Sequence, residues 1–206
     1  MCAVHSLNNL FQAPKYDKLL FDTAADLLRT NERRILDDAD VEGDGENGER
    51  DPYSTRTGDY NFDVIQQVLL GSGYSLQFVT SNDIGTLGSD PHHAFLVSTE
   101  QTCKHFYAVR TLNGWFWNLN SFSKRPTQMT TEQVTDLCQT AIDMRGERLK
   151  VWRLTPTPSP PTNAIPTVLK SSVKTVGWTD EMLNNQYWWS ASFLEELERN
   201  ELDTSK

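Results

Sequence analysis

Apolar residues recur at helical spacing through the first third of the chain. In residues 2–12, the apolar positions Ala3, Leu7 and Leu10 fall on one stripe. Pro14 cannot continue a helix, so the pattern predicts a helix that ends before it. The same period predicts two more helices, over residues 19–36 and 62–70.

The middle of the chain changes to segments rich in β-branched and aromatic residues, which predict strands. The predicted strands are residues 74–80, 93–98, 104–112, 114–120 and 148–154. A helical pattern at 130–144 lies between the last two. Helices followed by strands predict an α+β fold, with N-terminal helices packed on a mainly antiparallel sheet.

Two segments lack such periodicity. Residues 37–51 are acidic and rich in glycine, which indicates a loop. Residues 155–162 read TPTPSPPT, an extended proline-rich linker. The linker therefore separates a domain at 1–154 from a tail at 163–206, in which we expect one helix around Phe193.

A hairpin in the middle of the sheet allows a register to be worked out. Asn-Gly at 113–114, between two alternating runs, is typical of a two-residue hairpin loop. Such a loop pairs Leu112 with Trp115. Extending the ladder from this pair puts His105 opposite Phe122.

The same register brings an asparagine to His105. Asn120 lies on the face of His105 in the neighbouring strand, on the diagonal, at roughly 7–8 Å between backbone positions. Asn118 shares that face but pairs with Val109, further along the ladder. Asn120 is therefore the better partner for His105.

A histidine oriented by an asparagine is half of a Cys-His-Asn triad, which still needs a thiol. Cys2 begins the first predicted helix, and a helix N-terminus stabilises a thiolate. The residues alone leave structural roles open, because a lone His on a strand and a Cys in an apolar setting are common in protein interiors.

Composition narrows the class of protein. The 206 residues carry a formal charge of -9, which excludes the basic surface needed for nucleic acid and favours basic protein partners. Three cysteines do not form a disulfide framework. The sequence has neither a signal peptide nor an apolar run long enough to span a membrane. We expect a protein of a reducing compartment, the cytoplasm or the nucleus.

Several segments resemble Josephin-domain deubiquitinases, a family of papain-like cysteine proteases. CAVHSLNNLFQ at residues 2–12 is similar to the family's CAxHxLNNxxQ helix. KHFYAVR at 104–110 resembles its His strand, and WFWNLNS at 115–121 resembles its Asn strand. DYNFDVI at 59–65 resembles the segment that opens its third helix. The resemblance extends from Cys2 to about Leu154.

The resemblance implies a papain-like fold and cleavage after the C-terminal Gly-Gly of ubiquitin. It implies Cys2 as nucleophile, His105 as general base and acid, and Asn120 as the residue that orients His105. The expected partners are ubiquitin or polyubiquitin chains, with no cofactor and no metal, and we expect a monomer. It also implies that the acidic 37–51 segment corresponds to a helical arm that helps to hold ubiquitin.

One departure from the family leaves a second function open. Family members carry a Gln a few residues before the nucleophile, and its amide helps to form the oxyanion hole. This sequence starts at Met1, so either the recorded start is too late or another group replaces that donor. The alternative function is a catalytically weak module that binds ubiquitin.

Three other interpretations have weaker support. Removal of Met1 would make Cys2 an N-terminal nucleophile, with its own amino group as base. Cys2 and His5, with cysteines and histidines elsewhere, partly match a zinc site. The acidic segment from Asp38 to Glu49 partly matches a calcium-binding loop.

Overall fold

The computed structural model describes residues 2–38, 53, 60–89, 93–100, 105–112, 114–123 and 125–157. Its elements follow the order α1 (Cys2–Phe11), α2 (Lys18–Asp38), α3 (Phe62–Gly71), β1 (Tyr74–Phe78), α4 (Ser81–Gly85), β2 (Ala94–Thr99), β3 (His105–Leu112), β4 (Trp115–Leu119), β5 (Thr127–Met129), α5 (Thr131–Asp143) and β6 (Leu149–Pro156). The predicted acidic segment beyond Asp38, the rest of the linker and the tail fall almost entirely outside the described residues.

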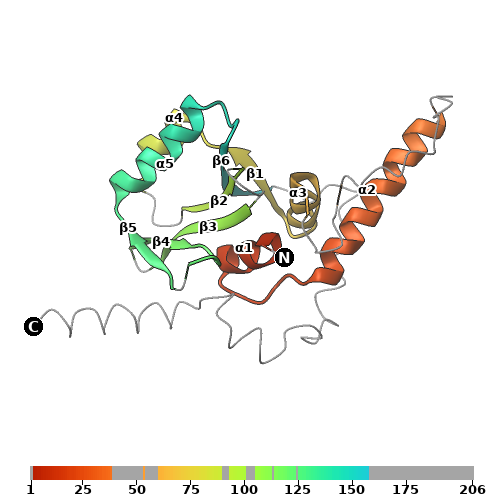
Figure 1. Ribbon diagram of the computed structural model, residues 1–206, viewed down its shortest axis with the longest axis horizontal. Coiled ribbons are helices and arrows are strands. Elements are labelled where there is room, and N and C mark those ends of the chain that lie inside the picture. Colours follow the sequence, from red (N-terminus) through yellow and green to blue (C-terminus); the bar gives the residue numbers. More distant parts are fainter. Residues whose placement is uncertain are drawn as a thin grey trace, which may run out of the picture.

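A single antiparallel sheet organises the described part of the chain. Its six strands lie in the order β1-β6-β2-β3-β4-β5. Helices α1, α2 and α3 contribute to the core on one face, and α4 and α5 to the core on the other (Figure 1). The predicted α+β fold, with helices on an antiparallel sheet, is confirmed.

Local chemistry explains where the helices begin. The side chain of Asn61 accepts a hydrogen bond from the backbone N–H of Val64 and caps α3. Thr130 and Gln133 form a capping box at the start of α5. These polar side chains replace backbone partners that the first turn of a helix lacks.

The apolar stripe of α1 packs as the sequence predicts, whereas the stripe predicted for α2 is buried only in part, with Leu19 69% exposed. Leu7 and Leu10 of α1 are fully buried against the sheet. Phe21 of α2 is also fully buried, whereas Ile35 near its other end is 64% exposed. Accordingly, α2 packs near its start and extends away from the body of the molecule (Figure 1).

Several boundaries and two short elements differ from the sequence prediction. Helix α2 continues to Asp38, into the predicted acidic loop. Strand β6 continues to Pro156, past Leu154, because Thr155 and Pro156 pair with β1. Helix α4 and strand β5 were not predicted, since elements of five and three residues are too short to show a period. In the described part of the chain, no helix is both long and apolar enough for a membrane span.

Candidate active site

The hairpin of β3 and β4 has the predicted register. Leu112 pairs with Trp115, and the ladder continues to Ala108 opposite Leu119. Gly114 has φ +84°, a backbone conformation that glycine adopts without strain and that tight hairpin turns require. The turn therefore fixes which residues of β3 and β4 face each other.

His105 and Asn120 are joined by a hydrogen bond just beyond the end of this ladder. The distance from His105 Nε2 to Asn120 Oδ1 is 2.8 Å. Asn118, the other candidate, has a side-chain oxygen without any hydrogen-bond partner. The prediction that Asn120 rather than Asn118 contacts His105 is confirmed.

A second donor fixes the protonation pattern of the imidazole. The backbone N–H of Phe122 donates to the same Asn120 Oδ1 at 3.0 Å, so this atom must be the amide oxygen. An oxygen that only accepts requires His105 Nε2 to carry the proton. In the neutral ring, Nδ1 therefore has the free lone pair, and no described group hydrogen bonds to it.

Burial favours the neutral form of His105. The residue is only 4% exposed, and this desolvation lowers the pKa of His105 below its usual value, while the hydrogen bond to Asn120 acts in the opposite direction. The positive N-terminal amino group also lowers the pKa of both His105 and His5.

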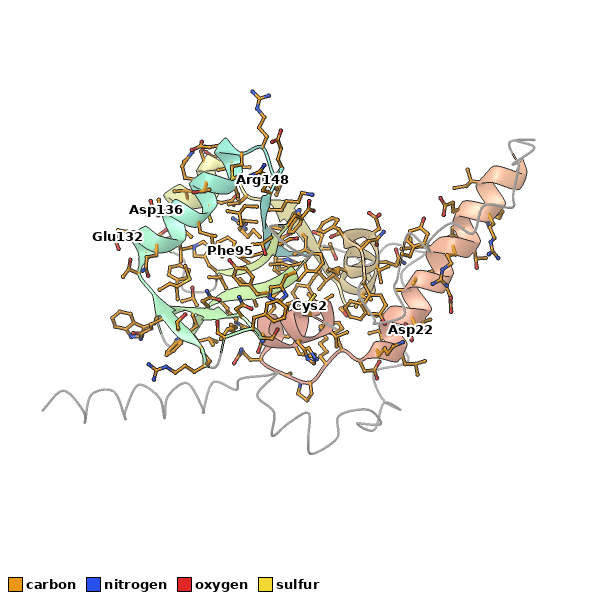
Figure 2. All side chains as sticks on the ribbon, viewed as in Figure 1. Cys2, Asp22, Phe95, Glu132, Asp136 and Arg148 are labelled. Carbon is orange, nitrogen blue, oxygen red and sulfur yellow. The ribbon has the colours of Figure 1, made fainter. Side chains whose placement is uncertain are left out.

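Cys2 occupies the first residue of α1, where the helix N-terminus favours a negative charge (Figure 2). Its thiol is free and partly exposed, and its side chain packs against the core cluster that includes Phe106, the neighbour of His105. Helix α1 packs more extensively on β3 than any described helix does on any other strand. No hydrogen bond joins Cys2 to His105, because Nδ1 has no partner in the described part of the chain.

The ring of Phe122 covers His105, a feature that the sequence interpretation left without a role. The two ring centroids are 3.8 Å apart and the planes differ by 7°. The predicted register already put Phe122 opposite His105, so the pairing was a usable signal. Its face-to-face contact with His105 depends on the turn that follows Asn120, which the ladder does not determine.

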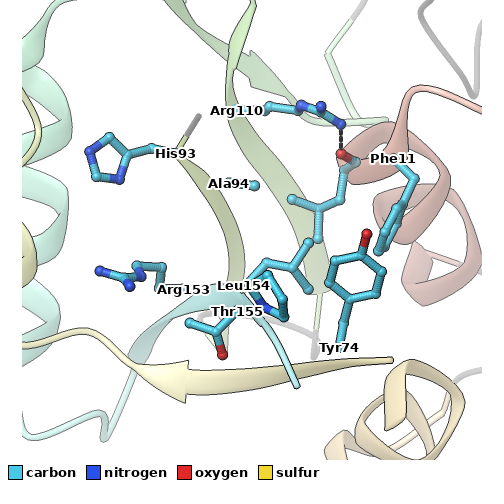
Figure 3. Close-up of a pocket in the computed structure, with 10 residues that line it drawn as sticks. Phe11, Tyr74, His93, Ala94, Arg110, Arg153, Leu154 and Thr155 are labelled. Atoms are coloured by element: carbon cyan, nitrogen blue, oxygen red, sulfur yellow. Dashed lines mark hydrogen bonds between the residues drawn. The ribbon is translucent and has the colours of Figure 1, made fainter. Parts of the chain in front are cut away.

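Two pockets lie at opposite ends of β2. One of about 300 Å³ lies beside Phe11, Tyr74 and Arg110 (Figure 3), at the end where Ala94 pairs with Arg110. The other, of about 320 Å³, includes Ser98, whose partner Phe106 adjoins His105. Only the second pocket is at the His105 end of the strand.

A metal centre finds no support in the described ranges. No group of three or more histidine, cysteine, aspartate or glutamate side chains gathers there in a way that could hold an ion. Cys103 and His92, which contributed to the zinc interpretation, lie outside those ranges, as does most of the acidic segment of the calcium interpretation.

The α+β fold and the hydrogen-bonded pair of His105 and Asn120 are features expected of a cysteine-protease-like domain, and comparison with known proteins identifies the family. The sequence profile of the Josephin family matches residues 1–151, so this chain belongs to the Josephin family, a family of cysteine-protease-like deubiquitinases. A putative ataxin-3 homolog from Oryza sativa subsp. japonica is 26% identical over 141 residues, which cover 63% of this chain and 40% of that relative. The match thus spans well under half of that protein's length.

Proposed function

We propose that this chain is a thiol-dependent deubiquitinase that hydrolyses the peptide or isopeptide bond after the C-terminal Gly of ubiquitin. Cys2 would be the nucleophile, His105 the general base and acid, and Asn120 the residue that orients His105. The observation that supports this most strongly is the His105–Asn120 hydrogen bond of 2.8 Å, which leaves the Nδ1 lone pair without a partner. A buried polar atom without a partner costs folding free energy, and a catalytic role is one explanation for keeping it.

In the first step, the thiol proton of Cys2 passes to Nδ1 of His105, and the thiolate attacks the carbonyl carbon of the C-terminal Gly. The helix N-terminus at Cys2 stabilises the thiolate, and Asn120 stabilises the imidazolium through Nε2–H. The tetrahedral intermediate collapses when Nδ1–H protonates the leaving amine. Catalytic hydrogen bonds are often long without substrate, which is compatible with a His105 Nδ1 that has no hydrogen-bond partner here.

In the second step, the thioester between Cys2 and the ubiquitin carbonyl is hydrolysed. His105 Nδ1 takes a proton from water, whose oxygen attacks the thioester carbon. Collapse of this second intermediate expels the Cys2 thiolate, which regains its proton from Nδ1. The product carboxylic acid gives its proton to solvent and leaves as the carboxylate, and the enzyme returns to its starting protonation state.

The pocket at the His105 end suggests where the substrate chain lies. It is lined by the stacked rings of Phe62 and Trp152, with centroids 4.5 Å apart, and by Ser98. Ser98 is 1% exposed and its hydroxyl has no partner. Cys2 packs against the cluster that contains Trp152. We expect the substrate segment before the scissile bond to lie along this pocket and to contact the rings of Phe62 and Trp152.

The test uses ubiquitin with a thiol-reactive group at its C-terminus. We expect a covalent adduct with the wild-type chain and none with Cys2→Ala. The matched control is Cys138→Ala, because Cys138 is fully buried in α5 and burial raises the pKa of its thiol to about 12. That variant should form the adduct at the wild-type rate.

Two outcomes would replace this proposal. Binding of ubiquitin without any adduct, with no hydrolysis of a ubiquitin C-terminal amide, would indicate a ubiquitin-binding module. Hydrolysis that persists in His105→Ala would indicate that Cys2 uses another base, such as its own amino group.

A further inference from the structure

The pocket at the end of β2 opposite His105 has no role in the proposed function. It lies between the C-terminal end of α1 and the end of β6 (Figure 3). Side chains of Leu10, Phe11, Leu154 and Pro156 line it together with Arg110, and we call it the Arg110 pocket. Its volume of about 300 Å³ is at the lower end for ligand pockets, so it suits a few side chains of a chain segment.

Two arginines give the Arg110 pocket a positive charge, and no carboxylate is among the described residues that line it. Arg153 pairs with Asp83 at 2.5 Å, outside the lining. Arg110 is half-buried, and its guanidinium donates to the backbone carbonyl of Leu10, which is neutral. Arg110 therefore keeps a charge that no carboxylate balances in the described part of the chain, and an acidic ligand would supply the missing partner.

The chain leaves the described fold beside this pocket. Strand β6 ends at Pro156, which lines the pocket, and the N–H of Thr157 donates to the backbone carbonyl of Gly73 at 2.9 Å. Roughly thirty residues separate Thr157 from Trp189 in the tail, and an extended chain spans about 3.3 Å per residue, so this segment can return to the pocket. A tether of this kind gives a local concentration on the order of 1 mM.

The tail combines aromatic rings with negative charge. Residues 178–203, WTDEMLNNQYWWSASFLEELERNELD, contain seven Asp or Glu and one Arg. Within them Trp189, Phe193 and Leu197 follow at four-residue steps, which predicts an apolar stripe on a helix, and Glu195 and Glu196 follow Phe193 closely. The chain as a whole has a formal charge of -9, so most of its surface repels such a segment, whereas the Arg110 pocket attracts it.

We propose that the Arg110 pocket binds the chain's own segment 187–198, with the rings of Trp189 and Phe193 against its apolar wall and the glutamates that follow close to Arg110. Docking there covers Leu10 and Phe11 at the C-terminal end of α1 and leaves the candidate active site open. The inference therefore does not depend on the proposed deubiquitinase activity.

The pocket at the His105 end is the competing site within the domain. It also contains cations, Arg145 and Lys150, beside the rings of Phe62 and Trp152. However, β6 starts near that pocket and ends at the Arg110 pocket, so the tail begins at the latter. The experiment has to separate these two sites.

The first measurement uses a synthetic peptide of residues 183–203 and three full-length proteins. These are the wild type, the double variant Trp189→Ala/Phe193→Ala, and the matched control Trp178→Ala, which lacks a tryptophan outside the peptide. Calorimetry gives the affinity for the peptide. NMR follows the methyl signals of Ala94 and Leu154, which line the Arg110 pocket.

We expect the peptide to bind the double variant, whose pocket is vacant, and to bind the wild type about tenfold more weakly, because the tethered tail competes with it. Trp178→Ala should match the wild type, and a peptide with alanine at 189 and 193 should not bind. In the double variant, peptide should move the methyl signals of Ala94 and Leu154 to the positions that they have in the wild type without peptide.

The second measurement places the segment by reversing one charge at each pocket of the double variant. Lys15 is exposed and borders the Arg110 pocket, with Nζ 4.2 Å from the ring centroid of Phe11. Lys150 lines the other pocket. We expect Lys15→Glu to weaken peptide binding about fivefold, because an attraction becomes a repulsion. Lys150→Glu changes the net charge equally and should leave the affinity unchanged.

Equal affinity of the wild type and the double variant, or no binding by the double variant at about 1 mM peptide, would overturn the inference. A loss confined to Lys150→Glu would also overturn it and would place the segment in the other pocket. If the wild type sedimented as a dimer that the double variant dissociated, the segment would bind a second copy instead of its own chain. No arm of the experiment uses ubiquitin, so its failure would not count against the proposed function.

Discussion

The two ends of α1 are built in opposite ways. At its C-terminal end, side-chain hydrogen bonds fix the helix to its surroundings: Asn9 donates to the backbone carbonyl of Leu119, and Arg110 donates to that of Leu10. At its N-terminal end, Cys2 is partly exposed and His105 Nδ1 has no described partner. The comparison shows a helix that side chains anchor at its C-terminal end, while Cys2, the proposed nucleophile at its N-terminal end, has a free and partly exposed thiol.

Asn8 makes the strongest set of contacts at the anchored end. It is fully buried, its Oδ1 accepts from the backbone N–H groups of Lys15 and Tyr16 at 2.8 Å, and its Nδ2 donates to Tyr16 O at 2.8 Å. We expect Asn8→Ala to lower the free energy of unfolding by about 4 kcal/mol, because it leaves buried backbone groups without partners. Urea denaturation measures this loss.

A matched control for Asn8 is Asn118→Ala, which removes a side-chain oxygen that has no partner. We expect that variant to lose under about 1 kcal/mol. If both variants lost the same free energy, the hydrogen bonds of Asn8 would not be the anchor of α1, and the contrast between the two ends would disappear.

The second prediction concerns His5, one turn after Cys2 and 6% exposed. Burial, aided by the positive N-terminal amino group, lowers the pKa of His5 to about 4. The unfolded chain therefore binds a proton at higher pH than the folded one. His5 therefore costs no stability above about pH 6.5, but the free energy of unfolding falls as the pH drops below that value, and the loss reaches at most about 3 kcal/mol at pH 4.

The measurement is the free energy of unfolding of the wild type and of His5→Gln between pH 4 and pH 6.5. Carboxylates titrate in both proteins, so their contributions cancel in the difference. We expect the wild type to lose more stability on acidification than the variant does. If the free energy of unfolding fell in parallel for the two proteins, burial would not hold His5 neutral in the folded protein.

The parts of the candidate site differ in how well the sequence predicts them. The register of β3 and β4 follows from the two-residue turn, and with it the contact between His105 and Asn120. The position of Phe122 over His105 depends on a turn beyond the ladder, where no alternation applies. The distance from Cys2 to His105 depends on how α1 packs on the sheet, which side chains such as Asn8 and Arg110 determine. The apolar pattern predicts which face of α1 is buried, but it does not predict how far Cys2 then lies from His105.

The third prediction concerns Asn120, which serves the reactive end. Asn120→Ala removes the acceptor of His105 Nε2–H and of Phe122 N–H. The imidazole then loses the partner that fixes its tautomer, so we expect kcat for a ubiquitin C-terminal amide to fall roughly 10²-fold. Because Asn120 is partly exposed, water can replace its bonds, and the free energy of unfolding should change by about 1 kcal/mol or less.

Two further variants sharpen this prediction. Asn120→Asp keeps an oxygen acceptor and should retain more activity than Asn120→Ala, while Asn118→Ala on the same strand should leave kcat unchanged. Full activity in Asn120→Ala would remove Asn120 from the proposed mechanism. We expect Asn120→Ala to lose activity with little loss of stability. We expect the reverse for Asn8→Ala, which lowers the free energy of unfolding and affects Cys2 only through the helix. The residue that stabilises the fold, Asn8, and the proposed nucleophile, Cys2, would then lie near opposite ends of one ten-residue helix.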